Sequence, residues 1–248
     1  MASTPLHLIS VNIEGNRHFE DRLFPFLKKT PADVVCLQEV FEVDIPALEA
    51  VIGAKAHFQP MANIDTTTVH APARGIWGIA QFSHLPIKYV NHTYYKGVAG
   101  HIPRFFENDD PNSMNRVVQW MQVTKDDQPY TVATTHFTWS VRGESTPEQF
   151  RDQDALLKVL QRLPDFILCG DLNAPRGNET FARFAQLYTD NIPAHYTTSI
   201  DGSLHKAGNI ELMVDGLFTT PEYQASEVEL VKGISDHMGI VADLLRVS

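Results

Sequence analysis

Short runs of apolar and β-branched residues recur along the whole chain, and polar segments separate them. Runs of about four to eight such residues predict β-strands. The segments with this pattern are 6–11, 33–37, 76–82, 117–123, 130–135, 165–169, 212–218, 227–231 and 239–245. A helical pattern follows Thr146, a good N-cap, with Pro147 next and Gln149 in the capping-box position. Weaker helical patterns cover 18–29, 44–52 and 178–188.

Two segments, 60–75 and 94–115, lack a regular pattern, and the second is rich in Pro, Gly, Asn and Asp. Long loops in compact domains are usually functional or disordered, and we interpret these two as loops over a site. No repeat and no Gly-, Ser- or Pro-rich linker divides the sequence, so residues 1–248 are predicted to form one domain. Interleaved strands and helices favour an α/β fold in which helices cover two packed sheets.

Composition narrows the classes of function. The chain has 30 acidic and 20 Lys or Arg residues, so its net charge of −10 argues against binding polyanions by bulk charge. The net charge does not exclude a local basic cleft. The start of the chain lacks the pattern of a secretory signal, and no window has the ~18 apolar residues of a membrane span, which predicts a cytoplasmic protein. Cys36 and Cys169 lie in apolar runs and are predicted to be buried thiols.

Polar residues at the ends of the predicted strands carry the candidate chemistry, because a rigid scaffold presents catalytic groups there. They are Asn12, Glu39, His136, Asp171, Asn173, Asp215, Asp236 and His237. Carboxylate and amide oxygens suit Mg²⁺, and imidazoles can donate protons to a phosphate or handle a water. Taken singly, each motif also fits a structural reading: GDLN as a turn, SDH as a loop, and Glu39 as an exposed charge.

The joint order of these motifs resembles the endonuclease/exonuclease/phosphatase superfamily of metal-dependent phosphoesterases. The matching segments are SVNIEGN (10–16), LQEV (37–40), GIAQFSHLPI (78–87), Arg116 in NRVVQW, THF (135–137), Arg151 with Gln153, GDLNAP (170–175), Asp215 in VDGLF, and SDH (235–237). The resemblance runs from about residue 6 to 245, and GDLN and SDH are its specific motifs. It implies a four-layer α-β-β-α sandwich with two mixed β-sheets.

The resemblance implies a metal site and a water-binding site. Glu39 would be the principal Mg²⁺ ligand, with Mn²⁺ as an alternative ion. Asn12 would lie beside the ion, and Asp236 would bind it directly or through water. Asp171 would position or deprotonate the attacking water, and Asn173 would help to orient that water and the phosphate.

The same resemblance implies phosphate contacts. His136 and His237 would contact phosphate oxygens, and Asp215 would pair with His237. Arg116 would support the site or reach the phosphate. Whether Asp171 or the His237–Asp215 pair is the general base stays open at this point.

Some residues depart from the family pattern. We interpret His84 as a surface turn residue. Gly216 follows Asp215, where a side chain is common, which leaves some substrate contacts in doubt. His205 and Lys206 have no counterpart and are interpreted as loop residues.

The leading hypothesis is a monomeric Mg²⁺-dependent phosphodiesterase that acts on nucleic acid or a nucleotide-linked adduct, as a nuclease does. Basic and aromatic residues near the loops could hold a phosphate backbone and stack bases, or could instead be solvated or pack the loops: Arg74, Lys96, Arg104, Arg116, Arg142, Phe105, Phe106 and Trp139. The second hypothesis is a phosphatase or phosphodiesterase for lipid headgroups, inositol phosphates or other small phosphoesters. The third, an inactive binding module, requires a missing site residue, and none is missing.

Overall fold

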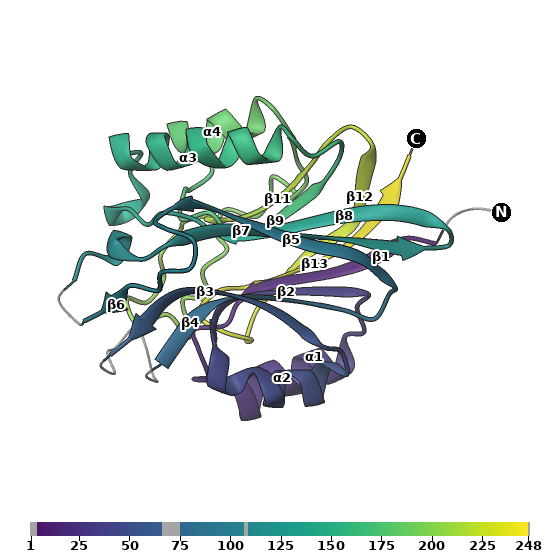
Figure 1. The fold of residues 1–248 in the computed structure, drawn as a ribbon, viewed down its shortest axis with the longest axis horizontal. Coiled ribbons are helices and arrows are strands. Elements are labelled where there is room, and N and C mark those ends of the chain that lie inside the picture. The colour runs from purple at the N-terminus through teal and green to yellow at the C-terminus, as the bar shows by residue number, and fades with distance from the viewer. Residues whose placement is uncertain (1–3, 66–74, 107–108, 248) are drawn as a thin grey trace.

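Two mixed β-sheets face each other in the computed structural model, which describes residues 4–65, 75–106 and 109–247. Helices α1 (Phe24–Lys29) and α2 (Ile45–Ile52) cover the outer face of one sheet. Helices α3 (Pro147–Leu160) and α4 (Glu179–Ala185) cover the outer face of the other (Figure 1). The predicted four-layer α-β-β-α sandwich is therefore confirmed.

The seven-stranded sheet has the order β12-β13-β1-β2-β4-β3-β6. Its strands are β1 (Leu6–Asn12), β2 (Val34–Phe41), β3 (Ala56–Ile64), β4 (Gly75–Ser83), β6 (Arg104–Phe105), β12 (Tyr223–Val231) and β13 (Gly239–Arg246). Strands β1 and β2 run parallel, whereas β13 pairs antiparallel with β1. Both chain ends lie at one end of the sandwich (Figure 1). Strand β1 starts near that end and terminates at Asn12.

The six-stranded sheet has the order β10-β11-β9-β8-β7-β5. Its strands are β5 (Ile87–Lys96), β7 (Arg116–Lys125), β8 (Gln128–His136), β9 (Ile167–Asp171), β10 (Thr189–Asp190) and β11 (Asp215–Thr219). Strands β8 and β9 run parallel and both end at the same edge, where the antiparallel β11 begins. This edge carries the candidate site.

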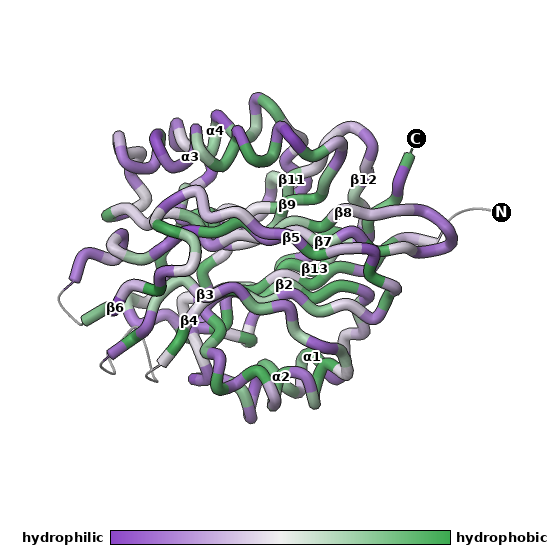
Figure 2. Tube along the Cα trace, in the orientation of Figure 1, coloured by the Kyte–Doolittle hydropathy of each residue, from purple (hydrophilic) through white to green (hydrophobic). Residues whose placement is uncertain are grey.

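Alternation of side chains along the strands creates three apolar layers. In β1, Leu8 points between the sheets, where Val132 and Ile167 of the second sheet also lie. Ile9 and Val11 point the other way and pack beneath α1 and α2. Hydrophobic residues concentrate along the central strands in Figure 2, as expected for sheets that are covered on both faces.

Helix α3 begins where its N-cap was predicted. The Thr146 hydroxyl accepts a hydrogen bond from the backbone N–H of Gln149 at 3.1 Å. The Gln149 side chain does not turn back to complete a capping box. Instead, its amide nitrogen donates to the carbonyls of Thr138 (2.8 Å) and Asn173 (3.0 Å), and so ties the helix to two loops of the site edge. The other predicted helices are also present, and a π-helix, Phe19–Leu23, precedes α1.

Two long strands, β3 and β5, and two strands of two residues each, β6 and β10, were missed by the sequence patterns. β3 contains Pro60 at an irregularity in its register, and β5 is an edge strand that leaves much of its surface exposed. Proline and a weak apolar alternation both hide a strand from pattern analysis. The predicted loop 60–75 was therefore wrong over 60–64, and its part at 66–74 lies outside the described residues. The predicted loop 94–115 contains the end of β5, the short β6 and a 3₁₀ turn.

Several predicted strands have different bounds in the structure, and for two of them, β11 and β12, the physical reason is clear. β11 begins at Asp215 rather than at residue 212, because the preceding residues bond to other loops: Ser199 donates its N–H to the Leu212 carbonyl, and Leu172 donates to the Val214 carbonyl. β12 starts before residue 227, because a bulge with Glu227 at φ 48° interrupts its apolar alternation.

Other sequence predictions concern single residues and membrane insertion. Cys36 and Cys169 are buried free thiols, and His84 is exposed in a turn, as predicted. None of the helices in the described ranges is long and apolar enough to cross a membrane.

Gly170 is required by the close approach of β8 to β9. It has φ +135°, and an added Cβ would lie 2.2 Å from the Thr135 carbonyl oxygen. We expect Gly170→Ala to lower the free energy of unfolding by about 2 kcal/mol more than Gly177→Ala does. Gly177 has φ +100° but open space around it, so it controls for backbone strain alone. Urea unfolding of both variants measures the difference, and equal losses would contradict the steric argument.

Candidate active site

Three neighbouring strands place polar side chains next to one another at one edge. His136, the last residue of β8, lies opposite Asp171, the last residue of β9. Asp171 in turn lies opposite Asp215, the first residue of β11. Asn12 ends β1 in the other sheet and reaches across to Asp171. The edge therefore joins residues that lie far apart in the chain, since Asn12 and Asp171 are 159 positions apart.

Glu39 reaches this edge through a bulge in β2. The register against β4 shifts between Leu37 and Val40, so one extra residue lies in β2. Glu39 itself has φ 60°, in the left-handed region that non-glycine residues rarely adopt. Bulges re-aim side chains, and backbone strain of this kind clusters at functional sites. The bulge brings the Glu39 carboxylate to 3.0 Å from the Asn12 amide nitrogen.

Asp171 is the centre of the hydrogen-bonded cluster. Its Oδ1 accepts the backbone N–H of Asn173 at 2.8 Å. Its Oδ2 accepts from the Asn12 amide at 3.1 Å and lies 3.4 Å from His136 Nε2 and 3.8 Å from His237 Nε2. The side chain is 2% exposed. This buried carboxylate is thus held between two imidazoles and an amide.

His237 is paired with Asp215. The two residues share a hydrogen bond of 2.8 Å between His237 Nδ1 and Asp215 Oδ2. Burial alone would lower the pKa of His237, but the carboxylates of Asp215 and Asp171 outweigh it and raise this pKa well above its usual value. The His237 imidazole is therefore protonated at neutral pH, and Asp215 fixes its orientation.

His136, in contrast to His237, is neutral. Burial is the main reason why its pKa falls to about 3, and Arg116 and His237 lower it further, whereas Asp171 opposes the shift. Its ring lies 5.4 Å from the Trp77 ring, centroid to centroid. The site therefore holds one neutral and one protonated imidazole on either side of Asp171.

The donor set at this edge fits a divalent metal ion. Burial, together with the nearby Asp236 carboxylate, raises the pKa of Glu39 to about 8. The negative charges of Glu39 and Asp236 repel each other when no positive charge is present, so a divalent cation would be favoured between their carboxylate oxygens. A second compact group is Asp171, Asp215 and His237, whose ligand atoms lie within 4.8 Å of one another. In that group His237 Nδ1 and Asp215 Oδ2 are hydrogen-bonded to each other, so these two atoms are not available as metal ligands. The chemistry of hard cations therefore favours the side of the cluster where Glu39 and Asp236 lie.

Asn12 contacts the carboxylates through its amide nitrogen. The nitrogen donates to both Glu39 and Asp171, and the amide oxygen accepts the backbone N–H of Glu14 at 3.2 Å. In this orientation Asn12 holds the two carboxylates in place, and its oxygen faces away from them. Its predicted place beside the metal stays a prediction.

Arg116 is buried beneath the site. Its guanidinium donates to the carbonyls of His136 (3.4 Å) and Pro111 (3.3 Å), and the residue is 2% exposed. Burial lowers its pKa. This geometry favours support of the β8 end over direct contact with substrate.

Several residues near the site carried no signal in the sequence patterns. The Ser199 hydroxyl accepts the backbone N–H groups of Val214 and Asp215, at 3.0 Å each, and so fixes the start of β11. Glu14, at φ 50°, is 8% exposed, and burial together with Asp236 raises its pKa to about 7. Lys206, predicted to be a plain loop residue, interacts electrostatically with Glu14 and Asp236.

The basic and aromatic residues of the predicted loops have different environments. Lys96 forms ion pairs with Glu148 (2.7 Å) and Asp152 (3.5 Å). Arg104 pairs with Asp65 and lies over the exposed Phe106 ring. Phe105 is partly buried, whereas Arg142 and Trp139 are exposed. Arg74 lies outside the described residues.

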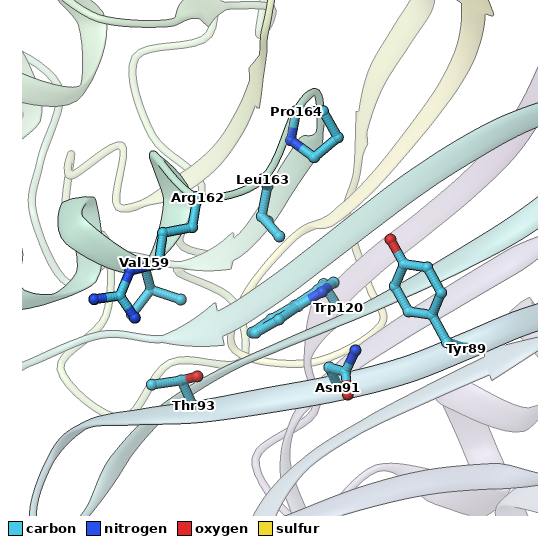
Figure 3. A pocket seen from close by; sticks show the side chains of 8 residues that line it. All are labelled: Tyr89, Asn91, Thr93, Trp120, Val159, Arg162, Leu163 and Pro164. Carbon is cyan, nitrogen blue, oxygen red and sulfur yellow. The ribbon is translucent and has the colours of Figure 1, made fainter.

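A surface hollow of about 370 Å³ lies away from this edge, on the outer face of the six-stranded sheet. Trp120, Tyr89 and Arg162 are among the residues that line it (Figure 3). Its lining contains neither a carboxylate nor a histidine. The hollow is therefore not a candidate for phosphoester chemistry.

The chain belongs to the endonuclease/exonuclease/phosphatase family. A model of this family matches residues 9–237, a span that includes every polar residue of the site edge. Members of the family are phosphoester hydrolases that generally depend on a divalent metal, so the protein is a phosphoester hydrolase. No curated protein sequence matched the chain.

Solved structures share the fold at low sequence identity. An endonuclease/exonuclease/phosphatase from Bacteroides vulgatus is 15% identical, with a TM-score of 0.72 over 98% of this chain and 100% of its own. A mannosyl-6-phosphatase from Bacteroides thetaiotaomicron is 10% identical, with a TM-score of 0.70 and coverage of 97% and 99%. The human Nocturnin catalytic domain with a bound sulfate anion is 19% identical, with a TM-score of 0.65 and coverage of 98% and 94%.

Proposed function

We propose that the protein is a Mg²⁺-dependent phosphodiesterase that acts on nucleic acid or a nucleotide-linked phosphoester. The observation that carries this proposal is the position of Asp171 between a protonated His237 and a neutral His136. A carboxylate with hydrogen-bond donors on either side can bind a water and present it to a phosphate. A monomeric state and a cytoplasmic location stay predictions.

Asp171 is assigned as the residue that orients and deprotonates the attacking water. Its Oδ1 is fixed by the backbone N–H of Asn173, and this contact holds the GDLN loop in its left-handed turn, with Asn173 at φ 47°. Asn173 is assigned to orient the water and the phosphate, although its side-chain nitrogen donates to the Phe137 carbonyl at 3.1 Å in this structure. Orientation of this kind can lower a barrier by several kcal/mol.

His237 is assigned as a proton donor to a phosphate oxygen. Its raised pKa keeps it charged, and Asp215 occupies Nδ1, so Nε2 is left to face the substrate. A group that is already protonated is a poor general base. The general-base role is therefore assigned to Asp171 rather than to the His237–Asp215 pair. Neutral His136 is assigned as a second hydrogen-bond donor to the phosphate.

Glu39 and Asp236 are the residues that would hold Mg²⁺, with Mn²⁺ as an alternative. When bound, the ion supplies positive charge that stabilises the phosphoryl oxygens and the leaving oxygen. The amide nitrogen of Asn12 lies 3.0 Å from the Glu39 carboxylate and 3.1 Å from the Asp171 carboxylate. Asn12 thus lies between the carboxylate assigned to the metal and the one assigned to the water.

Binding of Mg²⁺ is expected to depend on pH through Glu39. The pKa of Glu39 is about 8 in the folded protein, against 4.5 as the ordinary value, so folding takes up a proton between these pH values. Without metal, stability consequently falls as pH rises through this window. Mg²⁺ replaces that proton, so we expect the rise in Tm on adding Mg²⁺ to be larger near pH 8.5 than near pH 5.5.

Thermal unfolding of the wild type and of Glu39→Gln, with Mg²⁺ or EDTA, measures this dependence. Glu39→Gln should remove most of the Mg²⁺-induced rise in Tm at both pH values. Glu49→Gln is the matched control, because the Glu49 carboxylate lies at the surface and pairs with Lys55. An equal Mg²⁺ effect in the wild type and in Glu39→Gln would rule out the metal assignment.

The substrate class is tested by a panel assay with Mg²⁺, Mn²⁺ and EDTA. Its substrates are bis-p-nitrophenyl phosphate, single- and double-stranded DNA, an abasic duplex, a 5′-tyrosyl oligonucleotide, mannose 6-phosphate, sphingomyelin and inositol phosphates. Metal-dependent cleavage of the nucleotide-containing substrates is the expected result. Activity confined to the sugar, lipid or inositol phosphates would refute the nucleotide assignment.

A phosphatase for small phosphoesters is the second candidate. The net charge of −10 disfavours tight binding to long duplexes, and a structure of the same fold is a mannosyl-6-phosphatase. A higher kcat/KM for phosphomonoesters than for diesters would support this candidate over the first.

A further inference from the structure

Trp139 presents an exposed aromatic ring at the rim of the candidate active site. It lies three residues beyond His136 and is 39% exposed. Within residues 4–65, 75–106 and 109–247, its ring stacks on no other ring and its indole N–H has no hydrogen-bond partner. The indole thus presents an exposed face and an N–H that is open to a ligand.

The backbone of Trp139 is held from two sides. The Asn112 side-chain oxygen accepts the Trp139 N–H at 3.1 Å, and the Asn112 nitrogen donates to the Trp139 carbonyl at 2.9 Å. The same nitrogen also donates to Glu148 at 3.0 Å, and Glu148 is in turn paired with Lys96. These contacts fix the position of Trp139 without involving its side chain.

The segment that carries Trp139 is also joined to the catalytic loop. Asn173 donates its side-chain N–H to the Phe137 carbonyl, and Gln149 donates to the carbonyls of both Thr138 and Asn173. Gly143, further along the segment, lies against Pro175 of the GDLNAP motif. The backbone that carries the indole is therefore held in a fixed relation to the residues assigned to the water and the phosphate.

We propose that Trp139 is a specificity-determining residue that stacks the heteroaromatic base of a nucleotide substrate, and that Asn112 is its positioning residue. This inference rests on the proposed function and names the group attached to the phosphate. Stacking on an aromatic side chain favours any base, because every base has a π-face. Because the backbone of Trp139 is already held, only its side-chain torsions have to be ordered when the base arrives, which limits the loss of conformational entropy.

Binding of two ligands that differ only in the base tests this proposal. Adenosine 5′-monophosphate and ribose 5-phosphate share the phosphate and the sugar, and calorimetric titration in Mg²⁺ gives the Kd of each. For the wild type we expect the nucleotide to bind about 10-fold more tightly. Trp139→Leu should raise the Kd of the nucleotide about 10-fold and leave that of ribose 5-phosphate within about 2-fold.

Trp120→Leu is the matched control, because Trp120 lies in the hollow on the outer face of the sheet (Figure 3). It should change neither Kd. Asn112→Ala should weaken nucleotide binding alone, whereas a loss of general structure would weaken both ligands. Equal weakening of both ligands by Trp139→Leu, no weakening of either, or no preference for the nucleotide in the wild type overturns the proposal. Because these are binding measurements, they stand apart from the panel assay, in which absence of metal-dependent hydrolysis would refute the proposed function.

Discussion

Asp171→Asn should lower kcat by about 10³-fold with little change in Tm. The substitution keeps the size of the side chain and an oxygen that can accept the Asn173 N–H. It removes the negative charge that, in the proposed mechanism, deprotonates the water. General acid–base groups contribute about 10²–10⁴-fold to rate. The amide introduced by this substitution would also turn a nitrogen toward the donor groups of Asn12 and His237, so the water would lose its acceptor.

The measurement is kcat at saturating Mg²⁺, with the best substrate from the panel, together with Tm. Asp154→Asn is the control, because this exposed carboxylate on α3 pairs with Arg183 and lies outside the site. A kcat for Asp171→Asn within about 10-fold of the wild type would refute the assigned role. A large fall in Tm would instead indicate that Asp171 serves mainly to hold the cluster.

His237→Asn should lower kcat by at least about 100-fold, and Asp215→Asn should lower it less. In the proposed mechanism His237 is the proton donor, and Asp215 orients it through the 2.8 Å hydrogen bond. Because Asp215 acts through His237, the double variant should be no slower than His237→Asn alone. Groups that act as a unit are non-additive in this way.

The pH profile separates the roles of these two residues. The proposed mechanism requires protonated His237, so we expect activity to be lost as pH rises through the pKa of His237, which lies well above its usual value. Asp215→Asn removes a carboxylate that raises this pKa, so the alkaline loss of kcat should begin at lower pH than in the wild type. A shift of the alkaline limb to higher pH, or additive effects in the double variant, would contradict the pairing.

Most of the layered fold could be predicted from the sequence. Apolar runs identified the central strands, because strands that are buried on both faces need apolar residues throughout. The N-cap at Thr146 was found from local chemistry alone. The two long strands that were missed, β3 and β5, lie near the sheet edges, where Pro60 and exposed positions weaken the pattern. Edge strands are held by pairing with a neighbour, and a local pattern does not record that pairing.

The candidate site was predicted as a set of residues, and its arrangement was not. Asn12 and Asp171 are 159 positions apart, and only the face-to-face packing of the two sheets brings them to 3.1 Å. No motif pointed to the bulge that turns Glu39 into the site, or to the two hydrogen bonds that the Ser199 hydroxyl accepts at the start of β11. These features depend on partners that are distant in sequence.

The sequence by itself determined the chemical groups, the strand ends that carry them and the resemblance to a phosphoesterase family. The tertiary structure alone decided the charge states. The two histidines of the site differ in pKa, because burial dominates at His136, whereas the carboxylates of Asp215 and Asp171 dominate at His237. The fold likewise made supports for one edge of the site from Asn112, which no motif singled out, and from Gln149, for which the sequence predicted only a helix-capping role. Dielectric environment and the distance between charges exist only once the chain has folded, and they assign each group its role.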